Sequence, residues 1–321
     1  MYWNSEISPD REPHRVTLIR GEWVDTTRHN RTVPYKVYVP ETGTNTPMPV
    51  IIWSHGLGGS RDGAGFISRF VAAHGYIIVH IQHHGTDTSL WEGKPGHPWD
   101  NIRAARIPRK HVLQRYRDVP FALRCLHDGQ VPNVDPHLFD LSRLGMSGHS
   151  FGAMTTQVMA GQRIARGRRH YDLFQPEFRA GILYSPVPGR KDHADPDLVY
   201  SGIRIPLLHI TGTDDESPVE GFGYQRRLNV YNHAVHPDQH LVIIRNGDHM
   251  VFNGSRGQLA DNPDRPRHEE ILKIISLAWW DAHLKGNQAA QHWLSAHGIT
   301  GFFGADATYH HKSSTPQIPT G

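Results

Sequence analysis

The sequence of 321 residues contains one cysteine, Cys125, so no intrachain disulfide can form. Cysteine pairing therefore gives no information about the cellular compartment. Cys125 lies within a helical pattern of apolar residues, where we interpret it as a small buried hydrophobic residue rather than as a nucleophile.

Long apolar runs are also absent from the sequence. None approaches the roughly 20 consecutive residues that cross a bilayer, so we expect a soluble protein with no membrane span. Residues 1–6 lack the basic and apolar segments of a signal peptide. The protein is therefore expected to be either cytoplasmic or exported with a leader that precedes the printed residues. No feature of the sequence indicates an oligomeric state.

Charge of one sign is not in excess, because 34 Lys and Arg residues oppose 31 Asp and Glu residues, for a net charge of +3 at pH 7. This balance favours no nucleic-acid partner. Among the 25 His residues, His83 and His84 could form a metal site with Asp87. Adjacent His side chains point in different directions, however, and no distant ligand is indicated. We therefore expect no metal and no cofactor.

The apolar content of 37% is sufficient for one large core. We expect a single domain over residues 1–321, with its core at about residues 14–300. From about residue 304 the chain is rich in Ser, Thr, Pro and Gly. Residues 304–321 are therefore predicted to form a loose C-terminal tail.

Strand and helix patterns alternate along the chain, and continuous apolar runs indicate strands buried on both faces. Such a succession predicts an α/β fold with a mostly parallel central sheet and helices on both faces. One expected strand is the apolar run that precedes Gly148. The others cover residues 14–19, 32–39, 50–53, 76–81, 180–184, 205–210 and 241–244. The expected helices cover residues 64–74, 106–128, 151–166, 269–284 and 288–296.

A GxSxG motif at residues 148–152 lies between an apolar run and a helix-forming segment. Strand, sharp turn and helix are the parts of a nucleophile elbow, which would expose the hydroxyl of Ser150 at a helix N-terminus. A side chain at Gly148 or Gly152 would crowd that turn. The alternative is a chance occurrence on a surface loop, and the flanking patterns argue against it.

Two further segments are candidates for a site around Ser150. Glycines follow the apolar run 50–53, and glycines just past a central strand let backbone N–H groups face a ligand, as an oxyanion hole requires. The alternative is an ordinary Gly-rich turn. Residues 82–99 form the longest irregular stretch before the motif, and Trp91 and Trp99 are expected to line a substrate pocket there.

A serine hydroxyl needs an imidazole to take its proton and a carboxylate to orient that imidazole. His249 is the candidate base, because it follows the apolar run 241–244 and Gly247 permits a tight loop. Asp214 and Asp215 compete as the acid on one loop, and consecutive residues point in opposite directions, so only one can reach the ring.

Other acidic residues fit the role of the acid less well. Asp248 is bonded next to His249 and could not easily reach its Nδ1. The remaining candidates lie in a polar, Pro-containing loop that we interpret as solvated: Asp192, Asp195 and Asp197.

Four motifs follow one another along the chain: Ser54-His55-Gly56-Leu57-Gly58, Gly148-His149-Ser150-Phe151-Gly152-Ala153, Gly212-Thr213-Asp214-Asp215 and Gly247-Asp248-His249. In this order, over roughly residues 30–285, they resemble the α/β-hydrolase fold, and specifically its dienelactone-hydrolase and platelet-activating-factor acetylhydrolase branch. The resemblance implies that the acid is the fourth residue of the third motif, Asp215. Dienelactone hydrolases use a cysteine at the elbow, whereas this chain has Ser150, which favours a serine esterase. The resemblance does not fix the substrate.

The sequence therefore predicts a serine carboxylester hydrolase that acts on a small-molecule ester through an acyl-enzyme intermediate. The alternatives are an amidase, a lipase-like enzyme or an acyltransferase of the same fold, and a binding member without catalysis. The predicted catalytic residues are Ser150, Asp215 and His249, with the backbone N–H groups of Leu57 and Phe151 as the oxyanion hole. The predicted substrate-binding residues are His83, Trp91, Trp99 and Tyr184.

Overall fold

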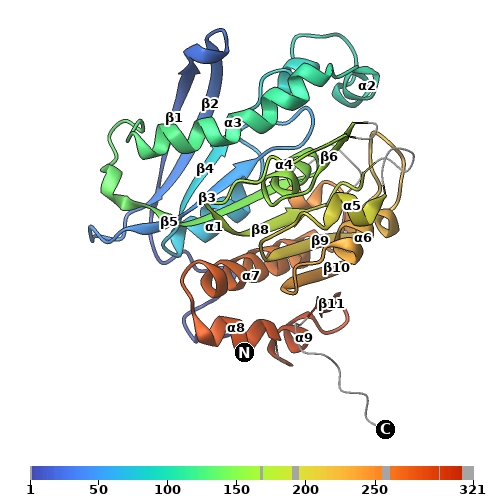
Figure 1. Ribbon diagram of the computed structural model, residues 1–321. Helices are drawn as coiled ribbons and strands as arrows, with labels where there is room; N and C mark the ends of the chain where they lie inside the picture. The colour runs from blue at the N-terminus through green and yellow to red at the C-terminus, as the bar shows by residue number, and fades with distance from the viewer. Residues whose placement is uncertain (1, 167–168, 190–194, 255–260, 296, 313–321) are drawn as a thin grey trace.

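The computed structural model describes residues 2–166, 169–189, 195–254, 261–295 and 297–312 (Figure 1). Within these residues nine strands form one sheet in the order β1-β2-β4-β3-β5-β8-β9-β10-β11. The strands are β1 (Val16–Asp25), β2 (Arg31–Pro40), β3 (Met48–Ser54), β4 (Ile77–Ile81), β5 (Phe139–His149), β8 (Phe178–Tyr184), β9 (Leu207–Asp214), β10 (Gln239–Asp248) and β11 (Ala307–Lys312). A separate hairpin consists of β6 (Ile164–Arg166) and β7 (Arg169–Tyr171).

The six strands from β4 to β10 in this order run parallel, whereas β1, β2 and β11 pair antiparallel at the two edges. Their apolar runs are buried on both faces, as β3 illustrates. Val50 and Ile52 pack in one apolar core, and Ile51 and Trp53 pack in the other. This follows from the two-residue period of a strand.

Helices cover both faces of the sheet (Figure 1). α1 (Gly65–Ala73), α7 (Arg265–His283) and α8 (Gln288–Ser295) share one core, and α3 (Arg109–His127), α4 (Phe151–Met159) and α6 (Tyr224–His233) share the other. Three short helices, α2 (Pro98–Ala104), α5 (Pro196–Tyr200) and α9 (His297–Phe303), complete the set in the described residues. The predicted α/β fold is confirmed. None of the helices in the described residues is long and apolar enough to span a membrane.

The C-terminal segment differs from the prediction. Residues 307–312 form β11, which pairs antiparallel with β10, so the expectation of a loose tail from residue 304 is wrong for this segment. Lys312 Nζ donates to the carbonyls of Tyr231, Asn232 and Ala234 at 2.6, 2.9 and 3.1 Å. An edge strand keeps one side in water, so a polar composition does not prevent it. Residues 313–321 lie outside the described part of the chain.

The parallel arrangement determines where polar side chains meet. β3, β5, β9 and β10 are aligned in direction, so the loops that follow them lie along one edge of the sheet. In register, Ser54 at the end of β3 is opposite Gly148 in β5, and Asp214 in β9 is opposite Asp248 in β10. The four sequence motifs therefore come together at this edge.

Candidate active site

Ser150 occupies a strained turn between β5 and α4. Its backbone angles are φ 54° and ψ −116°, a conformation that costs an L residue on the order of 1–3 kcal/mol. The Ser150 amide donates to the Tyr184 carbonyl at 2.9 Å, which holds the turn against β8. A Cβ on Gly148 would lie 2.4 Å from the Gly152 carbonyl carbon, and a Cβ on Gly152 would lie 1.8 Å from the Ser54 oxygen. Both glycines are therefore required by close backbone packing.

Asp215 and His249 meet across the ends of β9 and β10. His249 Nδ1 lies 2.7 Å from Asp215 Oδ1, and both residues are buried. The second carboxylate oxygen of Asp215 accepts from Thr211 Oγ1 at 2.8 Å. Asp214 is exposed, with its carboxylate 3.1 Å from Thr213 Oγ1. Of the two competing carboxylates, the structure brings Asp215 to the ring.

The other acidic candidates have local partners. Asp248 Oδ1 accepts from the amides of Met250 and Val251 at 2.8 and 3.0 Å, which shapes the loop that carries His249. Asp195 caps the N-terminus of α5, and Asp197 pairs with His233. Asp192 lies outside the described residues.

Arg227, on α6, is a site residue that the sequence reasoning missed. Its Nε lies 3.0 Å from Asp215 Oδ2 and donates to the Asp215 carbonyl at 3.1 Å, and its side chain is almost fully buried. Its Nη2 lies 3.2 Å from His249 Nδ1. Because Nδ1–H is directed at the nearer Asp215, Arg227 acts on the ring as a neighbouring charge. Arginines are frequent in surface helices, so no local signal in the sequence distinguishes this one.

Burial and these charges set the ionisation of the pair. Burial alone would raise the pKa of Asp215, but the charges of Arg227 and His249 lower that pKa to about 2. Burial lowers the pKa of His249, with Arg227 acting in the same direction and Asp215 opposing it. At neutral pH the pair therefore consists of a carboxylate and a neutral imidazole, whose Nε2 is left free to accept a proton.

Ser150 and His249 both line a cavity of about 910 Å³. Among the described residues no hydrogen bond joins Ser150 Oγ to the imidazole, and in unliganded enzymes such contacts are often long. One wall of the cavity is apolar and includes both predicted tryptophans. It consists of Leu57, Trp91, Trp99, Ile102 and Met250, and Leu90 packs against the same cluster without lining the cavity.

The amides predicted for an oxyanion hole lie at the same cavity. Phe151 is the first residue of α4, and the first amides of a helix have no partner within it. Leu57 lies in the turn after β3, and this turn is closed by hydrogen bonds from its neighbours: the Gly58 amide donates to the Thr86 carbonyl at 2.9 Å, and the Gly59 amide donates to the Gly56 carbonyl at 3.1 Å. Leu57 and Phe151 line the cavity together with Ser150.

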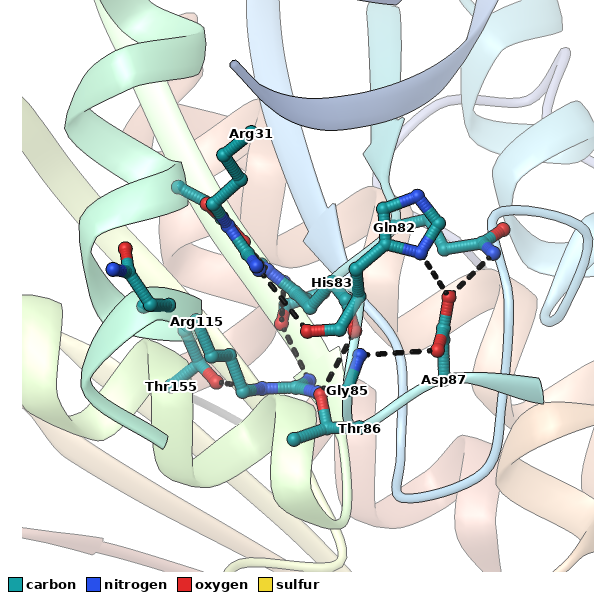
Figure 2. Close-up of polar contacts among 12 residues, drawn as sticks. Arg31, Gln82, His83, Gly85, Thr86, Asp87, Arg115 and Thr155 are labelled. Atoms are coloured by element: carbon teal, nitrogen blue, oxygen red, sulfur yellow. Dashed lines mark hydrogen bonds and ion pairs between the residues drawn. The ribbon is translucent and has the colours of Figure 1, made fainter. Parts of the chain in front are cut away.

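His83 does not line the cavity, so its prediction as a substrate-binding residue is wrong. The ring is fully buried in the network of polar contacts that Figure 2 shows. Its Nε2 accepts from Ser54 Oγ at 3.0 Å, and its Nδ1 donates to Asp118 Oδ2 at 3.0 Å. Burial and the charge of Arg115 lower the pKa of His83 to about 4, so the ring is a neutral structural element.

Tyr184 is also misassigned. Its backbone carbonyl supports Ser150, but its ring packs in the core on the α1 and α7 side of the sheet, and its hydroxyl lies 2.7 Å from Ser276 Oγ on α7. The preceding residue, Leu183, faces the opposite core. Successive side chains of a strand point to opposite faces of the sheet, so the Tyr184 ring lies on the α1 and α7 side and does not line the cavity.

One group of described residues has the composition of a metal site: Asp238, His240 and His311. They lie at the start of β10 and at the end of β11, at the opposite end of β10 from His249. Asp238 Oδ1 is 2.7 Å from His240 Nε2, and the rings of His240 and His311 stack with centroids 3.8 Å apart. Stacked rings direct their lone pairs side by side rather than toward one point, so the group fits a hydrogen-bonded cluster better than a coordination sphere.

Comparison with known proteins agrees with the motifs. Residues 27–92, which include the turn after β3, match the family model described as platelet-activating factor acetylhydrolase, isoform II. The platelet-activating factor acetylhydrolase of Canis lupus familiaris is 25% identical over 240 residues, 65% of this chain and 49% of that protein. That of Bos taurus is 26% identical over 243 residues, again 65% and 49%. The chain spans about half the length of these curated relatives.

Proposed function

We propose that this chain, a relative of the platelet-activating factor acetylhydrolase branch of the α/β hydrolases, is a serine carboxylester hydrolase. The observation that carries the proposal is the 2.7 Å contact between Asp215 and His249 beside a cavity that is also lined by Ser150 on its strained turn. A buried carboxylate that orients a neutral imidazole, at a cavity that a serine also lines, is the arrangement that activates a serine.

In the proposed reaction Ser150 Oγ attacks the carbonyl carbon of the ester while His249 Nε2 accepts its proton. The C–O bond to the alcohol breaks as His249 returns the proton to that oxygen, which leaves an acyl group on Ser150. In the second half of the reaction His249 Nε2 accepts a proton from water as the water oxygen attacks the acyl carbon. The bond from that carbon to Ser150 Oγ then breaks, His249 returns the proton to Ser150 Oγ, and the carboxylic acid leaves. Asp215 keeps the imidazole in the tautomer with hydrogen on Nδ1 and stabilises the imidazolium.

The backbone N–H groups of Leu57 and Phe151 would hold the negative oxygen of each tetrahedral intermediate. Each such donor contributes about 10²–10³-fold in kcat in other serine hydrolases. No cofactor takes part in these steps. The curated relatives are named for hydrolysis of an acetyl group, so short acyl esters are the first substrates to test.

The test is a series of p-nitrophenyl esters from acetate to octanoate, measured with the wild type and with Ser150→Ala. We expect turnover by the wild type and a loss of about 10⁴-fold or more in the variant, because the members of a triad act as a unit. Labelling with a fluorophosphonate should be confined to the wild type. An inert and unlabelled wild type would favour the non-catalytic alternative, and turnover of matched anilides above that of esters would favour an amidase.

A further inference from the structure

Arg115 contacts both segments that carry the proposed oxyanion amides, and its contacts with Thr86 and Thr155 can be followed in Figure 2. It belongs to α3, its side chain is 0% exposed, and it does not line the cavity. No carboxylate of the described residues lies within salt-bridge distance of its guanidinium. The nearest acid on the same helix face, Asp118, is already paired with Arg28, Arg31 and His83.

The guanidinium holds the turn that carries Leu57. Its Nη2 donates to Ser54 Oγ at 2.9 Å and to the His55 carbonyl. Its Nη1 donates to Thr86 Oγ1 at 3.0 Å, and the carbonyl of that threonine accepts from the Gly58 amide at 2.9 Å. Arg115 therefore holds the turn at His55, two residues before Leu57, and through Thr86 at Gly58, directly after Leu57.

The same guanidinium also holds the residue that supplies the second amide. Its Nε donates to Thr155 Oγ1 at 2.7 Å, and that hydroxyl donates to the Phe151 carbonyl one helical turn earlier at 2.9 Å. The guanidinium also lies over the Phe151 ring, 4.5 Å from its centroid. One planar group thus connects the turn after β3 with the N-terminus of α4.

We propose that Arg115 is a positioning residue of the oxyanion hole, which sets the spacing between the Leu57 and Phe151 amides. A buried cation that no carboxylate contacts costs several kcal/mol, so packing alone does not account for it. A guanidinium carries five donors in one rigid plane, and only such a group reaches these separate acceptors together. Its positive charge, which Asp118 and Asp87 offset only from a distance, also favours the negative oxygen that develops in the reaction.

Burial lowers the pKa of Arg115 to about 9, so the side chain is still charged at neutral pH. The proposal rests on the esterase function proposed above, because amide spacing matters only where a carbonyl oxygen becomes negative.

The experiment compares two inhibitors with the same acyl chain. A trifluoromethyl ketone forms a hemiketal with Ser150, whose oxyanion occupies the hole, whereas the corresponding methyl ketone binds without adding. For Arg115→Met we expect kcat to fall about 100-fold and KM to change less than about threefold. The inhibition constant of the trifluoromethyl ketone should rise by a similar factor, and that of the methyl ketone should stay within about twofold.

Three further variants separate positioning from folding. Arg115→Lys keeps the charge but not the planar fork, so its kcat should lie between those of the wild type and Arg115→Met. Thr155→Val removes only the hydroxyl that links Arg115 to Phe151, and should lower kcat about tenfold with the same selectivity between inhibitors. Arg117→Met removes an exposed arginine from the same helix and should leave all constants unchanged. The acidic limb of kcat/KM should be the same in every variant, because it belongs to His249.

If Arg115→Met does not fold, as shown by thermal unfolding, Thr155→Val decides the matter. Equal weakening of both ketones, or an unchanged constant for the trifluoromethyl ketone in an active enzyme, would overturn the positioning role alone. A wild type that neither turns over esters nor binds the trifluoromethyl ketone more tightly than the methyl ketone would instead overturn the proposed function, and this inference with it.

Discussion

The imidazole Nδ1 of His249 is hydrogen-bonded to Asp215 Oδ1 at 2.7 Å, while the adjacent Asp214 is exposed to solvent. Two neighbouring carboxylates thus have different surroundings although they differ by one position in the chain. β9 ends at Asp214, so its neighbour leaves the strand and turns toward β10.

Asp215→Asn should lower kcat about 10⁴-fold, because an amide at this place stabilises the wrong tautomer of His249. Asp214→Asn is the matched control and should change kcat less than about threefold, since its side chain is exposed. Steady-state kinetics with a p-nitrophenyl ester measures both, and circular dichroism checks the fold. A larger loss in Asp214→Asn than in Asp215→Asn would remove Asp215 from the mechanism.

The acidic limb of kcat/KM should lie below pH 6.5, the ordinary pKa of histidine. His249 must be neutral to accept the serine proton, and burial lowers its pKa. Activity is therefore retained on acidification until the pH falls through this lowered pKa, where the imidazole becomes charged. A pH profile of kcat/KM measures the limb. A limb above 6.5 would mean that Asp215 outweighs burial and Arg227.

Arg227→Met should move that limb to higher pH, because the positive charge of Arg227 lowers the pKa of both His249 and Asp215. The variant should also be less stable, since a buried carboxylate loses its partner, a change that typically costs about 3–5 kcal/mol. Arg226→Met removes a neighbouring arginine that makes no contact with the pair and serves as the control. Equal limbs in the two variants would show that Arg227 does not act on His249.

Trp99→Ala should shift the acyl-chain preference toward longer esters, because it enlarges the apolar wall of the cavity. The rate on the acetate ester should change less than the preference. Trp91→Ala is a less specific variant, because Trp91 Nε1 donates to the Gly58 carbonyl at 2.7 Å and so supports the turn of Leu57. Trp91→Phe keeps an aromatic ring at this position and removes the hydrogen bond to the Gly58 carbonyl. An unchanged chain-length profile in Trp99→Ala would mean that this wall does not contact the acyl chain of the substrate.

Deletion of residues 307–321 should lower the thermal midpoint by at least about 5 °C, because it removes β11 and uncovers the edge of β10. Deletion of residues 313–321 removes none of the described strand contacts and is the control. Differential scanning calorimetry measures both. Equal midpoints for the two deletions would mean that β11 contributes little to the fold.

Local chemistry in the sequence was enough to predict the elbow, the order of the site segments and the class of fold. Gly148 and Gly152 are explained by backbone contacts within one turn and its neighbouring strand, and the apolar runs have the period of buried strands. The presence of Ser150 and His249 after such strands follows from the same patterns. These features depend on residues close together in the chain, so the sequence carries them directly.

Only the tertiary structure decided which side chains meet around them. Arg227 and Arg115 reach the site from helices whose docking onto the sheet has no local signature. Tyr184 and His83 were misplaced because strand register and the face of the sheet decide whether a residue near the elbow lines the cavity or the core. Asp215 was predicted over Asp214 from the third motif, and the structure supplies the physical reason, because β9 ends at Asp214 and Asp215 turns toward His249.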